Sequence, residues 1–183
     1  MLQAQVRNIG EDPTTLPRTY AALINDAIAG RPPDMGICMH LCRGNWKGAW
    51  LAEGGYDPVA DVLFNEINVD GFFLEYDSPR AGSFAPLRRV PKDKIVVLGL
   101  VTTKRGELES KEIVKRRIDE ASRSLTLEQL ALSPQCGFSS NFDTNALSAE
   151  EQIAKLRLVV AVSREIWWRQ ARTCCISQNA AES

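Results

Sequence analysis

Four short, nearly continuous apolar segments recur along the chain. They lie at residues 35–40, 71–76, 94–101 and 130–133. Runs of this length and composition are typical of strands that are covered on both faces of a parallel sheet. Segments with apolar residues at helical spacing alternate with them, at residues 20–28, 59–67, 113–121 and 153–167. Between Glu75 and Lys94 we expect a loop, but the alternation otherwise predicts an α/β fold built on a parallel sheet.

Two helix starts are marked by their local sequence. Asp57-Pro58 offers a capping carboxylate followed by proline at the first helical position. Ser148 with Glu151 three residues later matches a capping box, in which each side chain bonds to the backbone of the other residue. Both signals place helices after polar loops, as the alternation requires.

Length and composition are those of one ordinary globular domain. The chain has 183 residues, of which 44% are hydrophobic and 25% are charged. Its formal net charge of −1 gives no reason to expect nucleic acid or an anionic membrane as a partner. No apolar run approaches the roughly 18–20 residues that cross a bilayer, and the first residues resemble no signal sequence. We therefore expect a cytoplasmic protein whose five cysteines are free thiols or metal ligands.

Residues that can bind a metal follow three of the four predicted strands. His40, the only histidine, and Cys42 end the first strand, and they project to the same face because they are two residues apart. Glu75 ends the second strand, and Cys136 lies in the loop after the fourth. In a parallel α/β fold, reactive groups gather at the carboxyl ends of the strands. We therefore expect these four side chains to converge.

One imidazole, two thiolates and one carboxylate form a ligand set that suits zinc. Four protein ligands normally indicate a structural ion, but a carboxylate is displaced more easily than a thiolate. A substrate thiol could take the position of Glu75 and be deprotonated by the metal. Simpler interpretations stay open: His40 as a satisfied polar residue, either cysteine as a small buried side chain, and Glu75 as the ion-pair partner of Arg80 or Arg43. Cys38, deeper on the same face, is expected to fill the core.

Four segments carry a resemblance to a known family. They are MHLCRGNW, FFLEYDSPRAG, VVLGLVTTK and LSPQCGFSS. From about Glu11 to about Trp167 the chain resembles the C-terminal part of the cobalamin-independent methionine synthase superfamily, and above all its shorter, single-barrel homologues. The resemblance implies a TIM-type (β/α)8 barrel with a catalytic zinc held by the residues that match the four predicted ligands. The implied reaction is methyl transfer from a methylated folate to the thiol of homocysteine, which gives methionine.

The chemistry of the residues agrees with that reaction. A free alkyl thiol has a pKa near 8.5, so a metal is needed to supply the thiolate at neutral pH. Further polar residues at the strand ends are candidates for contacts to the substrate or to the metal ligands. They are Arg43, Asn45, Asp77, Arg80, Thr102, Thr103 and Lys104.

The chain accounts for only half of the implied barrel. Such a barrel typically needs about 250 residues and eight strands, whereas four strands are predicted here. An open half-barrel exposes two sheet edges and an apolar inner face, so we expect either a fragment of a longer protein or pairing with another half-barrel or a second copy. We expect residues 1–171 to form the partial barrel and residues 172–183, with Cys174 and Cys175, to be a flexible tail.

Two other functions stay open. Relatives in the superfamily resemble epoxyalkane–coenzyme M transferases, which use the same ligand pattern on a thiol that carries a sulfonate. A non-catalytic zinc-binding half-barrel is the third interpretation. The nearby cations Arg43, Arg80 and Lys104 do not decide among them.

Overall fold

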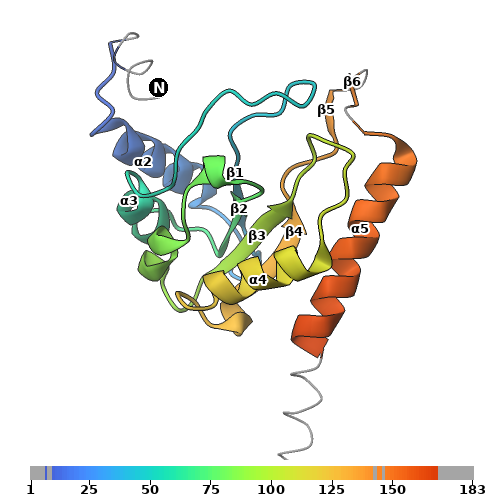
Figure 1. Cartoon of the computed structure of the whole chain (residues 1–183). Helices are drawn as coiled ribbons and strands as arrows, with labels where there is room; N and C mark the ends of the chain where they lie inside the picture. The colour runs from blue at the N-terminus through green and yellow to red at the C-terminus, as the bar shows by residue number, and fades with distance from the viewer. Residues whose placement is uncertain (1–6, 8–9, 142–143, 146, 169–183) are drawn as a thin grey trace, which may run out of the picture.

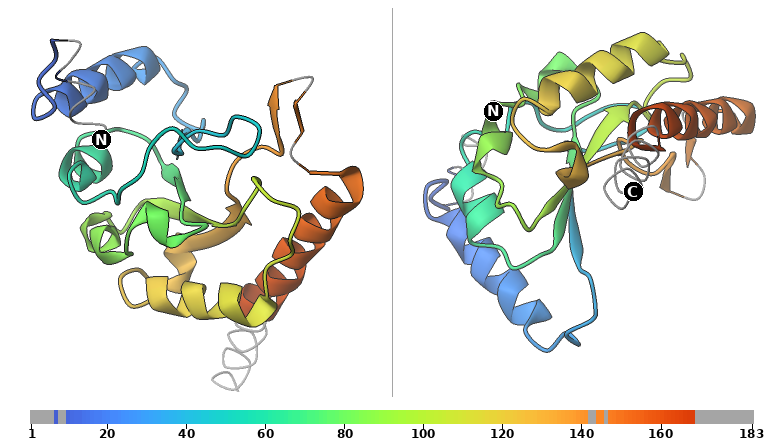
Figure 2. Two further views of the ribbon diagram at one scale, coloured as in Figure 1. Left: turned by 45° about the horizontal axis from the view of Figure 1, so that its top comes forward. Right: turned by 90° about the horizontal axis from the view of Figure 1, so that it is seen from below.

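A four-stranded parallel sheet forms the centre of the protein, and helices lie in an arc around it (Figure 1, Figure 2). The computed structural model describes residues 7, 10–141, 144–145 and 147–168. The strands, which neighbour one another in chain order, are β1 (Cys38–Leu41), β2 (Gly71–Glu75), β3 (Ile95–Val101) and β4 (Leu130–Pro134). All three pairings are parallel, which confirms the predicted α/β alternation. Sequential parallel strands with helices on one side are the arrangement expected of half a barrel.

Helices precede β1, connect the strands and follow β4. They are α2 (Leu16–Ile28), α3 (Ala60–Asn65), α4 (Lys111–Ala121), α5 (Ala149–Ser163) and the π-helical turn η4 (Arg164–Trp168). Short 3-10 turns are η1 (Pro79–Ala81), η2 (Ala85–Arg89) and η3 (Leu127–Gln129), and a hairpin of β5 (Ser139–Asn141) and β6 (Thr144–Asn145) follows β4. The predicted loop before β3 therefore contains two helical turns.

The two predicted helix starts have different outcomes. Ser148 accepts a hydrogen bond from the N–H of Glu151, whose carboxylate accepts one in return, so the capping box is confirmed. Asp57 does not cap α3. A turn closed by the N–H of Val59 on the carbonyl of Tyr56 comes first, and α3 begins only at Ala60.

One face of the sheet is packed against the helices and forms the core. Phe72 and Leu74 of β2 and Val96 and Leu98 of β3 are at most 1% exposed. The ring of Phe72 meets that of Phe64 in α3 edge-on, with centroids 5.2 Å apart. Burial of such large apolar side chains is the main driving force for folding of this side of the sheet against the helices.

The opposite face is open at β1, β2 and the start of β3 among the described residues, whereas Val97 further along β3 is only 9% exposed. Cys38 and His40 are exposed, and Phe73 and Ile95 remain 37% and 41% exposed. They alternate with the core residues because successive strand side chains point to opposite faces. The first strand is therefore not covered on both faces, and Cys38 does not fill the core. In a closed barrel this open face would be the interior.

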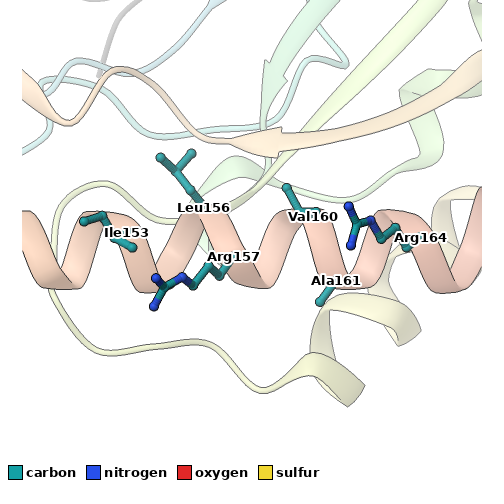
Figure 3. Close-up of a pocket in the computed structure, with 6 residues that line it drawn as sticks. All are labelled: Ile153, Leu156, Arg157, Val160, Ala161 and Arg164. Atoms are coloured by element: carbon teal, nitrogen blue, oxygen red, sulfur yellow. The ribbon is translucent and has the colours of Figure 1, made fainter.

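Helix α5 presents a second apolar surface. Leu158 and Val162 pack in the core, but the side chains on another side of the helix line an exposed groove (Figure 3). The lining residues are Ile153, Leu156, Arg157, Val160, Ala161 and Arg164. None of the helices in the described ranges has the length and apolarity needed to cross a membrane. The predicted tail at 172–183 lies outside the described residues.

Candidate metal centre

Three of the four predicted metal ligands lie together at the carboxyl ends of β1 and β4. One donor atom from each of His40, Cys42 and Cys136 lies within 4.8 Å of the other two. The Nε2 atom of His40 and the Sγ atom of Cys136 are 3.6 Å apart. A tetrahedral zinc ion with Zn–N bonds of about 2.0–2.1 Å and Zn–S bonds of about 2.3 Å holds such atoms roughly 3.5 Å apart. The donor set therefore fits zinc in its chemistry and in its spacing.

Two glycines allow the loops that carry the thiols to approach each other. Gly44 has a φ of +88° and directs its N–H toward Sγ of Cys42, at 3.4 Å. A Cβ on Gly99 would lie only 3.0 Å from Cα of Gln135, whose N–H donates to the carbonyl of Val101. The loop with Cys136 can therefore close over the end of β3 only because residue 99 has no side chain.

The surroundings of Cys136 oppose a thiolate when no metal is bound. Burial, and after it the neighbouring thiol of Cys42, raise the pKa of Cys136 to about 12, while Lys104 acts in the opposite direction. At neutral pH the free thiol is therefore protonated. A metal ion would have to displace that proton, so metal affinity is expected to rise with pH.

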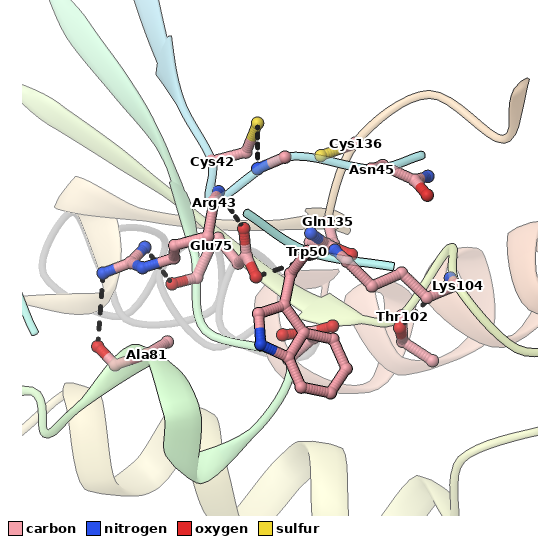
Figure 4. A network of polar contacts seen from close by, with 12 residues as sticks. Cys42, Arg43, Asn45, Trp50, Glu75, Ala81, Thr102, Lys104, Gln135 and Cys136 are labelled. Carbon is pink, nitrogen blue, oxygen red and sulfur yellow. Dashed lines mark hydrogen bonds and ion pairs between the residues drawn. The ribbon is translucent and has the colours of Figure 1, made fainter. Parts of the chain in front are cut away.

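Glu75 lies at the same edge of the sheet, but its carboxylate is held by other residues (Figure 4). It is fully buried and does not belong to the group of three donors. Its Oε2 accepts the N–H of Arg43 at 2.6 Å, and its Oε1 is paired with Arg80. Arg80 is also 3.0 Å from Asp77. The structure thus shows the ion pair of Glu75 and Arg80 that the sequence offered as the simpler interpretation.

Arg43 and Tyr56 lock the ends of β1 and β2 together. The guanidinium of Arg43 donates to the carbonyls of Gly54, Glu75 and Ala81 and, at 2.5 Å, to the hydroxyl of Tyr56. The same hydroxyl accepts the N–H of Glu75 at 2.9 Å. Arg43 is therefore occupied by structural bonds. Sequence reasoning missed Tyr56, because its partners are mostly backbone groups that no residue pattern marks.

The remaining candidates shape the loops around the site. Asn45 accepts the N–H of Gly48 at 3.2 Å and so holds the loop after β1. Thr102 accepts the N–H of Lys104 at 3.2 Å, and the hydroxyl of Thr103 donates to Oε1 of Gln135 at 3.4 Å. All three residues after β3 are buried.

A buried lysine of α5 supports the loop after β3. Lys155 is fully buried and donates to Glu109 at 2.9 Å and to the carbonyl of Glu107 at 2.6 Å. Glu109 in turn accepts the N–H of Thr102 at 2.8 Å. Sequence reasoning missed this contact, and the available signal was a lysine between apolar residues of the last helix.

Known proteins with similar sequences share less than half of their length with this chain. Residues 19–165 match the family model described as "Cobalamin-independent synthase, Catalytic domain". The proteins YxjH and YxjG of Bacillus subtilis (strain 168) are 55% and 52% identical over 163 and 164 residues. These alignments cover 88% and 89% of this chain but 43% of each relative. The chain thus spans less than half the length of the curated relatives that it matches.

Solved structures show the same partial coverage. The crystal structure of a putative vitamin-B12 independent methionine synthase from Listeria monocytogenes matches with a TM-score of 0.61 and 41% identity, over 86% of this chain and 43% of that one. A B12-independent methionine synthase from Shewanella sp. W3-18-1, in complex with selenomethionine, matches with a TM-score of 0.65 and 21% identity, over 84% and 44%. The latter shows the common fold. From its strand order, its family match and these relatives, the chain is half of a TIM-type (β/α)8 barrel and belongs to the cobalamin-independent methionine synthase family.

Proposed function

We propose that this chain is the zinc-binding half of an S-methyltransferase that transfers a methyl group from a methylated folate to homocysteine. The observation that carries the proposal is the cluster of His40, Cys42 and Cys136, whose donor atoms lie within 4.8 Å of one another. Membership of the family supports the reaction type. The two solved relatives are named as methionine synthases, and both names fit this proposal.

In this reaction the residues of this chain have two tasks, which are to bind the metal and to stabilise the buried carboxylate of Glu75. His40, Cys42 and Cys136 would hold zinc, which when bound supplies a Lewis acid that turns a substrate thiol into a thiolate at neutral pH. Three protein ligands with an open fourth position are typical of catalytic zinc sites. Glu75 would fill that position in the resting protein. Its contacts to Arg80 and to the N–H of Arg43 would keep the buried carboxylate compensated when a thiol takes its place.

Activity is expected to need a second half-barrel. The open face leaves Phe73 and Ile95 partly in solvent, and β1 and β4 each pair with one strand among the described residues. Apolar faces and free edges of this kind mark a surface that another chain or domain covers. The partner would be either another half-barrel or a second copy of this chain, and the chain's 43% share of its relatives favours the former.

Zinc content tests the proposed metal centre. The purified chain should hold about one zinc ion, and Cys136→Ser should lose most of it because one of three soft ligands is gone. Cys38→Ser is the matched control, since Cys38 is an exposed cysteine on the same face outside the cluster. Full zinc retention by Cys136→Ser, measured by atomic emission, would remove Cys136 from the site and contradict the proposal.

Thiol binding then separates the candidate functions. In a cobalt-substituted sample, homocysteine should change the visible absorption because its sulfur enters the coordination sphere. Consumption of a methylated folate in the presence of the assembled barrel would complete the test of the methyltransferase. The absence of any spectral response to thiols would favour a non-catalytic zinc-binding half-barrel.

A second candidate is alkyl transfer to a thiol that carries a sulfonate, of the epoxyalkane–coenzyme M transferase type. One observation fits it, although the same observation also fits a thiol that carries a carboxylate. Lys104 is a buried cation beside the metal cluster, and its ammonium group makes no hydrogen bond to any described residue. A response of the cobalt spectrum to coenzyme M but not to homocysteine would select this candidate.

A further inference from the structure

The three cations near the metal cluster differ in what they bind. The guanidinium of Arg43 donates hydrogen bonds to carbonyl groups and to the hydroxyl of Tyr56. Arg80 is paired with Glu75 and Asp77, and its guanidinium lies 4.4 Å from the ring centre of Trp50. The ammonium of Lys104 has no hydrogen-bond partner among the described residues. Of the three, only Lys104 has a charged group that makes no hydrogen bond at all to a described residue.

Lys104 is held at the site although its charge is poorly compensated. Its side chain is 4% exposed, and its nearest ion-pair partner is Oε1 of Glu75 at 3.7 Å, beyond hydrogen-bond length. A buried ammonium with three unused donors is unfavourable unless an acceptor is supplied. Lys104 lies at the same end of the sheet as the cluster, because its ion-pair partner Glu75 ends β2, and Figure 4 shows its side chain near Gln135, the residue before Cys136.

A second buried donor accompanies it. Gln135 is 2% exposed, and its Nε2 has no partner among the described residues while its Oε1 accepts the hydroxyl of Thr103. Figure 4 shows the side chain of Lys104 extending toward the amide of Gln135 and toward Glu75. Two neighbouring donor groups, neither of which has a hydrogen-bond acceptor among the described residues, are suited to bind the oxygen atoms of an anion.

We propose that Lys104 and Gln135 form a subsite for the anionic head group, carboxylate or sulfonate, of the thiol whose sulfur reacts at the neighbouring cluster. This inference rests on the proposed function, because it places the substrate thiol at the cluster of His40, Cys42 and Cys136. It goes further in assigning the recognition of the acceptor to two residues of this half-barrel. The substrate class is then a thiol with an acidic group on a short chain.

Alkylating reagents of equal reach but different charge test the subsite without a metal. A thiolate attacks iodoacetate and iodoacetamide alike and displaces iodide, so a change in the pKa of Cys136 affects both rates and cancels in their ratio. The reduced full chain, freed of metal by a chelator, is treated with each reagent, and mass spectrometry reads every cysteine separately. Cys38, exposed on the same face, is the internal reference. The ratio of iodoacetate to iodoacetamide rates should be about tenfold higher at Cys136 than at Cys38.

Substitutions assign that preference to the two residues. Lys104→Met should reduce the ratio at Cys136 to that at Cys38, and Lys104→Arg should keep it. Gln135→Glu should lower the ratio below the reference because it places a negative charge in the subsite. Lys115→Met removes the same charge from the outer side of α4 and should change nothing. Equal ratios at the two cysteines of the unaltered chain, or a ratio that survives Lys104→Met, would overturn the subsite.

A sulfonate reagent distinguishes the two sources of the anion. In the same assay 2-bromoethanesulfonate should show the larger preference for Cys136 if the acceptor carries a sulfonate, and iodoacetate if it carries a carboxylate. The labelling needs no zinc, so a failed subsite leaves the zinc content and thiol response of the metal centre unchanged. A failed metal centre likewise leaves the labelling ratios as they are.

Discussion

The two faces of the central sheet are made by alternate residues of the same strands, yet they have opposite environments. Phe72 lies fully buried between β2 and α3, whereas Phe73, the next residue, is 37% exposed. The covered face has its partners within this chain, and the open face presents His40 and Cys38 to solvent. Along each strand, residues that pack in the core therefore alternate with residues that are left exposed, among them His40 of the proposed metal centre.

Glu75 is the exception that connects the two environments. Its position, two residues after Phe73, places it on the open side of β2, but it is fully buried. Arg43, Arg80 and Tyr56 enclose it with hydrogen bonds. The carboxyl end of the sheet is thus closed by polar contacts, while β1, Phe73 and Ile95 lack a cover on this face in the described part of the chain.

The largest effect is expected on the covered face. Phe72→Ala should lower the free energy of unfolding by about 4 kcal/mol, because it removes a large side chain and leaves a cavity beside Phe64. Chemical denaturation followed by circular dichroism measures the change. A loss of this size is a large part of the stability of a typical domain.

Phe73→Ala is the matched control for that substitution. It removes the same atoms from the next residue, which is 37% exposed, and should cost less, about 1–2 kcal/mol. Equal losses at the two positions would break the comparison, since they would mean that the open face is covered in solution. A loss at Phe73 that grows with protein concentration would identify the cover as a second copy.

The next effect is expected at the polar closure around Glu75. Arg80→Met leaves two buried carboxylates, Glu75 and Asp77, without their common cation, and should cost about 3 kcal/mol in the metal-free chain. Zinc should reduce this loss, because a bound cation compensates the charge of Glu75. Unfolding curves with and without zinc measure both values.

A surface ion pair supplies the control for Arg80. Arg89 lies 2.7 Å from Asp61, but both side chains are at least half exposed, so Arg89→Met should change stability by about 0.5 kcal/mol or less. If Arg80→Met were equally mild in the metal-free chain, the polar end of the sheet would not depend on that pair. If zinc failed to reduce a large loss, Glu75 would not be a ligand of the metal.

The fold could be predicted from the sequence where apolar runs coincide with strands. Residues 94–101 predict β3 nearly to its bounds, because every residue of that strand after Ile95 is buried. The segment that contains the first strand is also nearly continuously apolar in sequence, yet Cys38 and His40 are exposed. Composition cannot distinguish a face covered by a helix from a face that another half-barrel would cover, since both are apolar.

The site could be predicted only in part, for a related reason. His40, Cys42 and Cys136 stand out because soft donors follow the ends of strands, and the structure brings them together. Tyr56 and Lys155 could not be found in this way. Their partners include backbone carbonyls and N–H groups at sequence separations of 15 to 48 residues, and such bonds depend on the folded path of the chain.

The smallest effect is expected at the ion pairs that join α4 to η4. Lys111 and Lys115 lie 2.7 and 2.8 Å from Glu165 and lower its pKa from 4.5 to about 2. A lowered pKa means that the folded chain binds this proton less tightly than the unfolded chain, so the contribution to stability is full above pH 4.5 and fades as the pH falls toward 2.

Glu165→Gln should therefore lower the melting temperature slightly at pH 7 and low salt. The difference from the unaltered chain should shrink below pH 4.5 and in high salt, because exposed charges are screened. Melting curves across pH and salt measure it. A loss as large as that of Phe72→Ala would show that surface charge, and not burial, holds the helices on the covered face.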